Sequence, residues 1–140
     1  MTGIAGHAHR YFPKHSTGYM ERLRIVQNVS AVTGACMLVS KSVYNQVDGF
    51  NDEYKVAFGD IDFCLKIRAC GYLNIWTPFA ELYHYEYRSR GAEDSPEKQL
   101  LGNESKLFYS RWQSVIDAGD PYYNRNLTLE REDFSFKFND

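Results

Sequence analysis

The stretch FGDIDFCLKIRACG, residues 58–71, is the most informative part of the sequence for the fold. Four apolar residues recur in it at the spacing of one helix face: Phe58, Ile61, Leu65 and Ala69. Gly71 stands where a helix-ending glycine is expected, so the pattern predicts a helix that begins at Gly59 or Asp60. Two acids, Asp60 and Asp62, then lie on its first turn.

The neighbouring segments predict an α/β order of elements. An apolar, partly β-branched run at residues 30–39 favours a buried strand, with Gly34 at a point of close approach. Ser40 is a candidate cap for a short helix that stops at Gly49. Residues 73–77 favour a second strand, and a long helix is expected from residues 95–97 to Gly119.

The remaining segments carry no sustained periodicity. Residues 1–28 are expected to be a loop-rich lead-in, residues 29–119 the core, and residues 120–140 an extended tail, all within one domain. An HxH pattern, His7 and His9 with His15 nearby, has no Cys or carboxylate partner in its loop and is interpreted as loop sequence, not a metal site.

The composition excludes several classes of protein. A net charge of −2 gives no general field for nucleic acid, and no apolar run approaches the roughly 18 residues of a membrane span. Three cysteines, Cys36, Cys64 and Cys70, lack CxxC spacing and indicate free thiols in a reducing compartment. We therefore expect a cytoplasmic location, with at most peripheral contact at the inner membrane face.

Several short motifs occur in a fixed order along the chain: Gly34-Ala35, Gly49-Phe50-Asn51-Asp52-Glu53, Asp60-Ile61-Asp62, Gly71-Tyr72 and His84. In this order they resemble the second half of family 2 glycosyltransferases. Three flanking pieces resemble the bacterial surface-polysaccharide (O-antigen) branch of that family: Ser89-Arg90-Gly91, Arg111-Trp112 and Asp120-Pro121-Tyr122-Tyr123-Asn124. The resemblance covers nearly the whole chain.

The resemblance implies a partial GT-A fold. The chain would be the acceptor-side half, a mixed sheet with flanking helices, without the amino-terminal nucleotide-binding βαβ half. The complete protein would be an inverting glycosyltransferase that moves a sugar from a nucleotide-sugar donor to a hydroxyl of a glycan or lipid-linked acceptor. The isolated chain is expected to be inactive.

The resemblance also implies roles for individual residues. Asp60 matches the catalytic base, although a helix cap alone would also explain an acid at this position. Substrate-binding roles fall on Gly34, Ala35, Asp62, Ser89 and Arg90, and His84 matches a metal or diphosphate contact. For Asp62, a surface ion pair with Lys66 is an equal alternative. Gly59 stands where many family members have an acid.

A divalent metal, Mn²⁺ or Mg²⁺, is expected in the complete enzyme, and none is expected to bind this chain tightly. Two other functions stay open: a glycan-binding or dimerisation module, and a small metal-dependent hydrolase that uses Asp60, Asp62 and His84. We expect a homo-oligomer formed through the bare sheet edge of residues 30–39 and 73–77.

Overall fold

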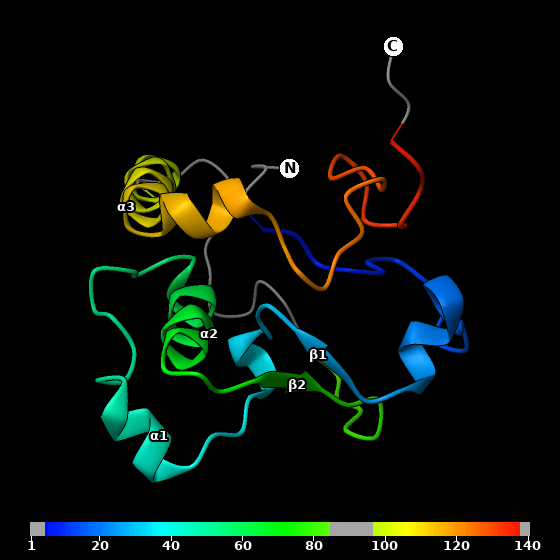
Figure 1. Ribbon diagram of the computed structural model, residues 1–140, viewed down its shortest axis with the longest axis horizontal. Coiled ribbons are helices and arrows are strands. Elements are labelled where there is room, and N and C mark those ends of the chain that lie inside the picture. The colour runs from blue at the N-terminus through cyan, green and yellow to red at the C-terminus, as the bar shows by residue number, and fades with distance from the viewer. Residues whose placement is uncertain (1–4, 85–96, 138–140) are drawn as a thin grey trace.

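A computed structural model describes residues 5–84 and 97–137, apart from the side chains of residues 97–99. Its elements follow in the order η1 (Tyr19–Arg24), β1 (Gln27–Val29), η2 (Gly34–Cys36), α1 (Lys41–Gln46), α2 (Gly59–Ala69), β2 (Asn74–Trp76) and α3 (Glu97–Ala118). Helix α2 lies between α3 on one side and α1 on the other, with the β1–β2 pair beside it (Figure 1).

Helix α2 confirms the central prediction from the sequence. It spans Gly59–Ala69 and is followed by Gly71 at φ 85°, the left-handed conformation that glycine adopts without strain. Two core clusters meet it from opposite sides. Leu65 packs with Tyr54, Phe58 and Phe108, the last of these from α3, and Phe63 and Ile67 pack with Val47. Helix α2 is therefore packed on both of these faces.

The sheet differs from the expectation. It has two strands, paired antiparallel with Asn28 opposite Ile75, so the expected mixed sheet is not observed in the described residues. The strand expected at residues 30–39 is wrong: β1 ends at Val29, and Gly34–Cys36 forms a 3₁₀ turn. The predicted strand at residues 73–77 is confirmed in its centre, as β2.

Side chains replace the expected strand pairing after β1. The Asn74 amide donates to the carbonyl oxygens of Ser30 (2.9 Å) and Cys64 (3.0 Å). The Val32 amide contacts Sγ of Cys64 at 3.5 Å, and the Thr33 hydroxyl accepts from the Ala35 amide at 3.3 Å. The backbone polar groups of this segment therefore find partners without a neighbouring strand. Periodicity alone could not predict this, since an apolar run favours a strand whether or not another strand lies beside it.

The two other predicted helices are also present. The hydroxyl of Ser40 accepts from the Val43 amide at 3.3 Å and caps α1. The long helix, α3, ends at Ala118 and is followed by Gly119 at φ 80°. Residues 95 and 96 of its expected start lie outside the described residues.

The carboxyl-terminal segment, residues 120–137, is folded back, not extended. Leu127 and Phe136 form an antiparallel bridge, and Leu127 and Phe134 are buried. This segment packs against the amino-terminal lead-in: the His9 amide donates to the Glu132 carbonyl at 2.9 Å, and the His9 and Phe134 rings stack 4.5 Å apart. The described part of the lead-in and the carboxyl-terminal segment thus pack against each other (Figure 1). The domain boundaries themselves stay a prediction.

None of the helices in the described part of the chain is long and apolar enough to cross a membrane.

Candidate functional site

Asp60 lies on the first turn of α2, half-buried, with both carboxylate oxygens oriented by backbone N–H groups. The Gly34 amide donates to Oδ2 at 2.9 Å, and the Ile61 amide donates to Oδ1 at 2.9 Å. The helix cap is Phe58, and it makes no side-chain capping bond. Each carboxylate oxygen has two lone pairs, so one on each oxygen stays available for a further donor.

Gly34 and Ala35 lie beside this carboxylate, at the exposed turn η2. A Cβ atom built on Gly34 would stand 3.4 Å from Cβ of Asp60, a tight contact. Gly34 thus brings its amide to the carboxylate with little room for a side chain at this position. Two contacts hold the residues that precede this turn. Val32 contacts Cys64, and Ser30 contacts Asn74. Burial raises the pKa of the Cys64 thiol, which fits a packing role for this cysteine.

Glu104 of α3 positions the loop that leads into α2. Its carboxylate is only 4% exposed and accepts three backbone hydrogen bonds. Oε1 accepts from the amides of Lys55 (2.7 Å) and Val56 (3.0 Å), and Oε2 accepts from the Ala57 amide (2.7 Å). The loop then reaches Phe58 at φ 64°, an uncommon conformation for a bulky residue, two positions before Asp60. Sequence reasoning missed Glu104, because no local pattern shows that a surface-type acid of one helix caps a distant loop.

Asp62 is fully buried, with 0% exposure, at the α2–α3 contact. Its Oδ1 accepts from Nε1 of Trp112 at 2.8 Å and lies 3.5 Å from Nε of Arg111. Lys66 is also an ion-pair partner, at 3.9 Å from Oδ2, so the predicted pair exists but is not on the surface. The reason is that Arg111 and Trp112 of α3 cover this face of α2. Asp62 is thus enclosed between α2 and α3 and does not reach solvent.

His84 is exposed and lies eight residues beyond the end of β2, in irregular backbone. Strand β2 stops at Trp76, before the turn at Pro78, so His84 does not lie at the end of a strand. Ser89 and Arg90 lie outside the described residues. Within residues 5–84 and 97–137, no group of three or more His, Cys, Asp and Glu side chains could hold a metal ion.

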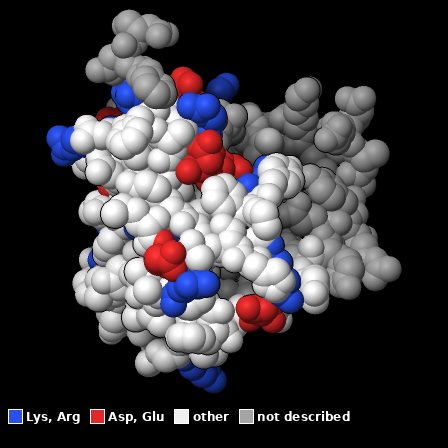
Figure 2. Space-filling model, turned by 90° about the vertical axis from the view of Figure 1, so that its right-hand side faces the viewer, with Lys and Arg blue, Asp and Glu red and all other residues white. Residues whose placement is uncertain are grey.

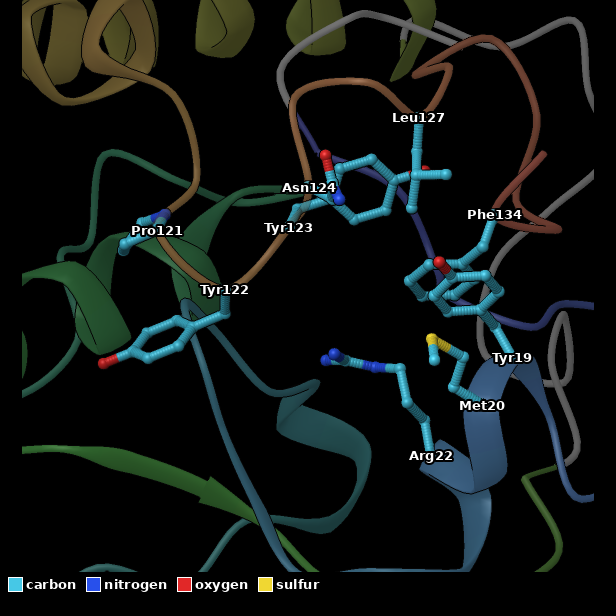
Figure 3. A pocket seen from close by; sticks show the side chains of 9 residues that line it. All are labelled: Tyr19, Met20, Arg22, Pro121, Tyr122, Tyr123, Asn124, Leu127 and Phe134. Atoms are coloured by element: carbon cyan, nitrogen blue, oxygen red, sulfur yellow. The ribbon is translucent and has the colours of Figure 1, made fainter. Parts of the chain in front are cut away.

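A pocket of about 390 Å³ lies between η1 and the carboxyl-terminal segment (Figure 3). Its walls include four aromatic rings and one cation: Tyr19, Tyr122, Tyr123, Phe134 and Arg22. On this side of the molecule, acidic and basic side chains are interspersed, with no single charged field (Figure 2). Sequence reasoning did not assign this pocket, because it forms only where η1 meets the carboxyl-terminal segment, about a hundred residues later in the sequence.

Comparison with known proteins finds relatives among proteins of polysaccharide biosynthesis. No family model matches the chain, and no solved structure matches it significantly. The O-antigen biosynthesis protein RfbC of Myxococcus xanthus is 34% identical over 138 residues, 95% of this chain. The N-acetylglucosaminyl-diphospho-decaprenol L-rhamnosyltransferase of Mycobacterium tuberculosis is 31% identical over 87 residues, 59% of this chain. This chain is related to the family 2 glycosyltransferases.

A third relative, the uncharacterized protein y4gI of Sinorhizobium fredii, is 50% identical over 133 residues, 94% of this chain. The chain spans only 15% of y4gI, 10% of RfbC and 28% of the rhamnosyltransferase. It therefore corresponds to a part of these longer proteins. The α/β architecture is compatible with a partial domain. The similarity to glycosyltransferases of polysaccharide biosynthesis agrees with the resemblance found in the sequence.

Proposed function

We propose that this chain is the acceptor-side part of an inverting glycosyltransferase and that Asp60 is its general base. The observation that carries the proposal is the fixed orientation of the Asp60 carboxylate, held between the Gly34 and Ile61 amides and still half-exposed. A base must reach the proton of the attacking hydroxyl within hydrogen-bond distance, and a carboxylate with free lone pairs at an exposed glycine turn satisfies this geometry.

The reaction balances as a single displacement. The acceptor hydroxyl oxygen forms a bond to the anomeric carbon, and the bond from that carbon to the diphosphate oxygen breaks. The electron pair leaves with the nucleoside diphosphate, and the hydroxyl proton passes to the Asp60 carboxylate. Attack from the face opposite the leaving group inverts the anomeric centre. Gly34 and Ala35 line the acceptor approach, while Glu104 and Asp62 hold α2 and its preceding loop in place.

In our proposal, other parts of the complete protein supply most of the donor site. The described residues include no cluster that fits a divalent metal, so we derive no step from a metal held here. In the complete protein, Mn²⁺ or Mg²⁺ would stabilise the leaving diphosphate, with His84, Ser89 and Arg90 as candidate contacts from this chain. Isolated, the chain should neither transfer sugar nor bind nucleoside diphosphates tightly. Calorimetry that shows tight metal-dependent binding of UDP to the isolated chain would contradict this division.

The acceptor is proposed to be a glycan or a lipid-linked sugar. The name of the mycobacterial relative specifies an acceptor carried on decaprenol diphosphate. Such an acceptor would bring the complete enzyme to the cytoplasmic face of a membrane as a peripheral protein. The scheme needs only a nucleotide-sugar donor and a glycan or lipid-linked acceptor, and nucleic acid has no role in it.

We further propose that the chain self-associates when isolated. Strand β2 and its flanks expose large apolar side chains, including Leu73 (58%), Ile75 (57%) and Phe79 (83%). An open two-stranded sheet next to such surface is a template for pairing with a second copy. Light scattering at micromolar concentration should give a dimer or a larger assembly, and a monomer would contradict this part of the proposal.

The stereochemistry of the product tests the proposed reaction. The complete protein that contains this segment would be incubated with a nucleotide sugar of known anomeric configuration and an acceptor, and the product analysed by NMR. Inversion at the anomeric carbon is expected. Retention would contradict the single-displacement scheme, and release of free sugar as the main product in the presence of acceptor would favour the hydrolase alternative.

A further inference from the structure

The pocket between η1 and the carboxyl-terminal segment has rigid aromatic walls. Phe134 is 6% exposed, and its ring stacks with Tyr19 at 5.1 Å between centroids and 4° between planes. Tyr123 packs on the same ring at 5.1 Å, and its hydroxyl donates to the Thr128 carbonyl at 2.8 Å. These contacts hold the walls in place without a ligand, which limits the ordering cost of binding.

Arg22 supplies a cation with no anionic partner among the described residues. Its guanidinium lies 5.5 Å from the Phe134 ring centroid and extends into the pocket between Tyr122 and Tyr19 (Figure 3). The acids of the neighbouring segment are engaged elsewhere. Oδ1 of Asp120 accepts from Ser30 and Tyr122, and Oδ1 of Asp133 accepts from Ser135. In contrast, Arg24 on the same turn pairs with Glu21 at 3.2 Å.

Asn124 adds a neutral donor to the same wall. Its Oδ1 accepts from the Asn126 amide at 2.9 Å, so the side-chain NH₂ group is the part that is left for a ligand. Aromatic faces, one half-buried guanidinium and an amide donor are together the lining of a small-ligand site with few, directional polar groups.

We propose that this pocket binds a sugar residue that carries a carboxylate, a uronic acid unit of the acceptor glycan. One guanidinium matches a single carboxylate in bidentate geometry, whereas a diphosphate would need more positive charge than the described lining offers. Because His9 and Tyr19 stack on the Phe134 ring, the apolar face of the sugar would pack on Tyr19 and Tyr122 and not on Phe134. The identification of the ligand as an acceptor rests on the proposed glycosyltransferase function; the site itself does not depend on Asp60.

The pocket lies away from the reacting hydroxyl. The Arg68 guanidinium, near the end of α2, lies 5.5 Å from the Tyr122 ring centroid, whereas Asp60 is on the first turn. Eight residues of helix separate Arg68 from Asp60, roughly 12 Å along the axis. In our proposal the sugar in this pocket would be a unit further along the acceptor than the reacting one, and the pocket would select acidic glycans.

Binding to the isolated chain tests this assignment. Amide NMR spectra of the ¹⁵N-labelled chain would be titrated with methyl glucuronide, methyl glucoside, and inorganic phosphate. We expect the glucuronide to shift the amides of Tyr19, Arg22, Tyr123 and Asn124 and to bind about tenfold more tightly than the glucoside. Arg22→Gln should weaken glucuronide binding by about the same factor and leave glucoside binding unchanged. Arg24→Gln is the matched control and should bind the glucuronide as the unmodified chain does.

Several results would overturn the assignment. They are equal binding of the two glycosides, phosphate binding more tightly than glucuronide, no shifts at tens of millimolar ligand, and glucuronide binding that survives Arg22→Gln. If Arg22→Gln does not fold, Arg22→Lys serves instead. Lysine keeps the positive charge but cannot bind a carboxylate in the bidentate geometry of a guanidinium, so glucuronide binding should still weaken selectively. Asp60→Asn should leave this binding intact, so a failure here is separable from a failure of the catalytic proposal.

Discussion

The Gly34 amide donates a 2.9 Å hydrogen bond to Oδ2 of Asp60, joining a turn and a helix that are 26 residues apart in the sequence. This bond brings the glycine-alanine motif and the acidic motif into one site. A Cβ atom on Gly34 would stand 3.4 Å from Cβ of Asp60. At this separation the Asp60 side chain would have to move by up to a few tenths of an ångström.

Gly34→Ala should therefore shift the Asp60 carboxylate while leaving the core intact. We expect a loss of stability below about 1 kcal/mol, since neither residue is in the core, but a clear change in the Ile61 and Asp60 amide resonances. In the complete enzyme, turnover should fall more than donor affinity, because a small displacement of the base affects the reacting geometry. Ala35→Gly, at the adjacent position, is the control. Unchanged resonances in Gly34→Ala would mean that the turn does not contact Asp60.

Glu104→Gln should destabilise the chain by about 1–3 kcal/mol, because the amide has one accepting oxygen and its NH₂ group then faces a partly buried backbone donor. Three backbone amides depend on the present carboxylate, two on Oε1 and one on Oε2. Urea denaturation measures the difference, with the exposed Glu130→Gln as the matched control. Equal midpoints for the two variants would show that Glu104 does not hold the loop before α2.

Trp112→Phe should cost about 1–3 kcal/mol, since it removes the 2.8 Å donor to a carboxylate that has no exposure. Thermal or urea unfolding measures this loss. Asp62→Asn in the same background tests the coupling: once the indole donor is gone, the second substitution should cost less than it does alone. Strict additivity of the two changes would argue against a direct Asp62–Trp112 interaction.

The stability of the chain should fall as the pH decreases below about 7, in part because of His9. Burial, followed by the nearby positive charge of Arg22, lowers the pKa of His9 from its ordinary value of 6.5. Its Nε2 accepts from the Tyr19 amide at 3.0 Å, which requires the neutral ring. Because the unfolded chain takes up this proton at higher pH than the folded chain, unfolding becomes more favourable as the pH falls through 6.5 toward the folded pKa.

His9→Gln should flatten this part of the pH profile, since a glutamine oxygen can accept from the Tyr19 amide without titrating. The exposed His15→Gln is the control and should keep the slope. Unfolding midpoints in urea between pH 5 and pH 8 make the comparison. A slope that persists in His9→Gln would assign the pH dependence to other groups.

Local sequence patterns were enough to predict the helices but not the strand pairing. The face of α2, the Ser40 cap and the glycines after α2 and α3 all depend on residues a few positions apart, so the sequence alone predicts them. The segment after Val29 depends on Asn74, Cys64 and Asp60, which are distant in sequence.

The same distinction applies to the candidate site. The proximity of Gly34 and Asp60 could be predicted because both belong to motifs of a known order. The burial of Asp62 and the role of Glu104 depend on how α3 packs on α2, and the Arg22 pocket depends on the contact of η1 with the carboxyl-terminal segment. None of these contacts has a local signature.

The most direct test of the central claim is Asp60→Asn in the complete protein that contains this segment, measured by turnover and by donor affinity in parallel. Asp117→Asn, at an exposed carboxylate on α3, is the matched control. We predict that turnover falls by about 10²- to 10⁴-fold while the Kd for the nucleotide sugar changes little, because proton transfer is lost and the diphosphate contacts are not. Turnover within a few-fold of the unmodified protein, or an equal loss of turnover and donor binding, would contradict the assignment of Asp60 as the base.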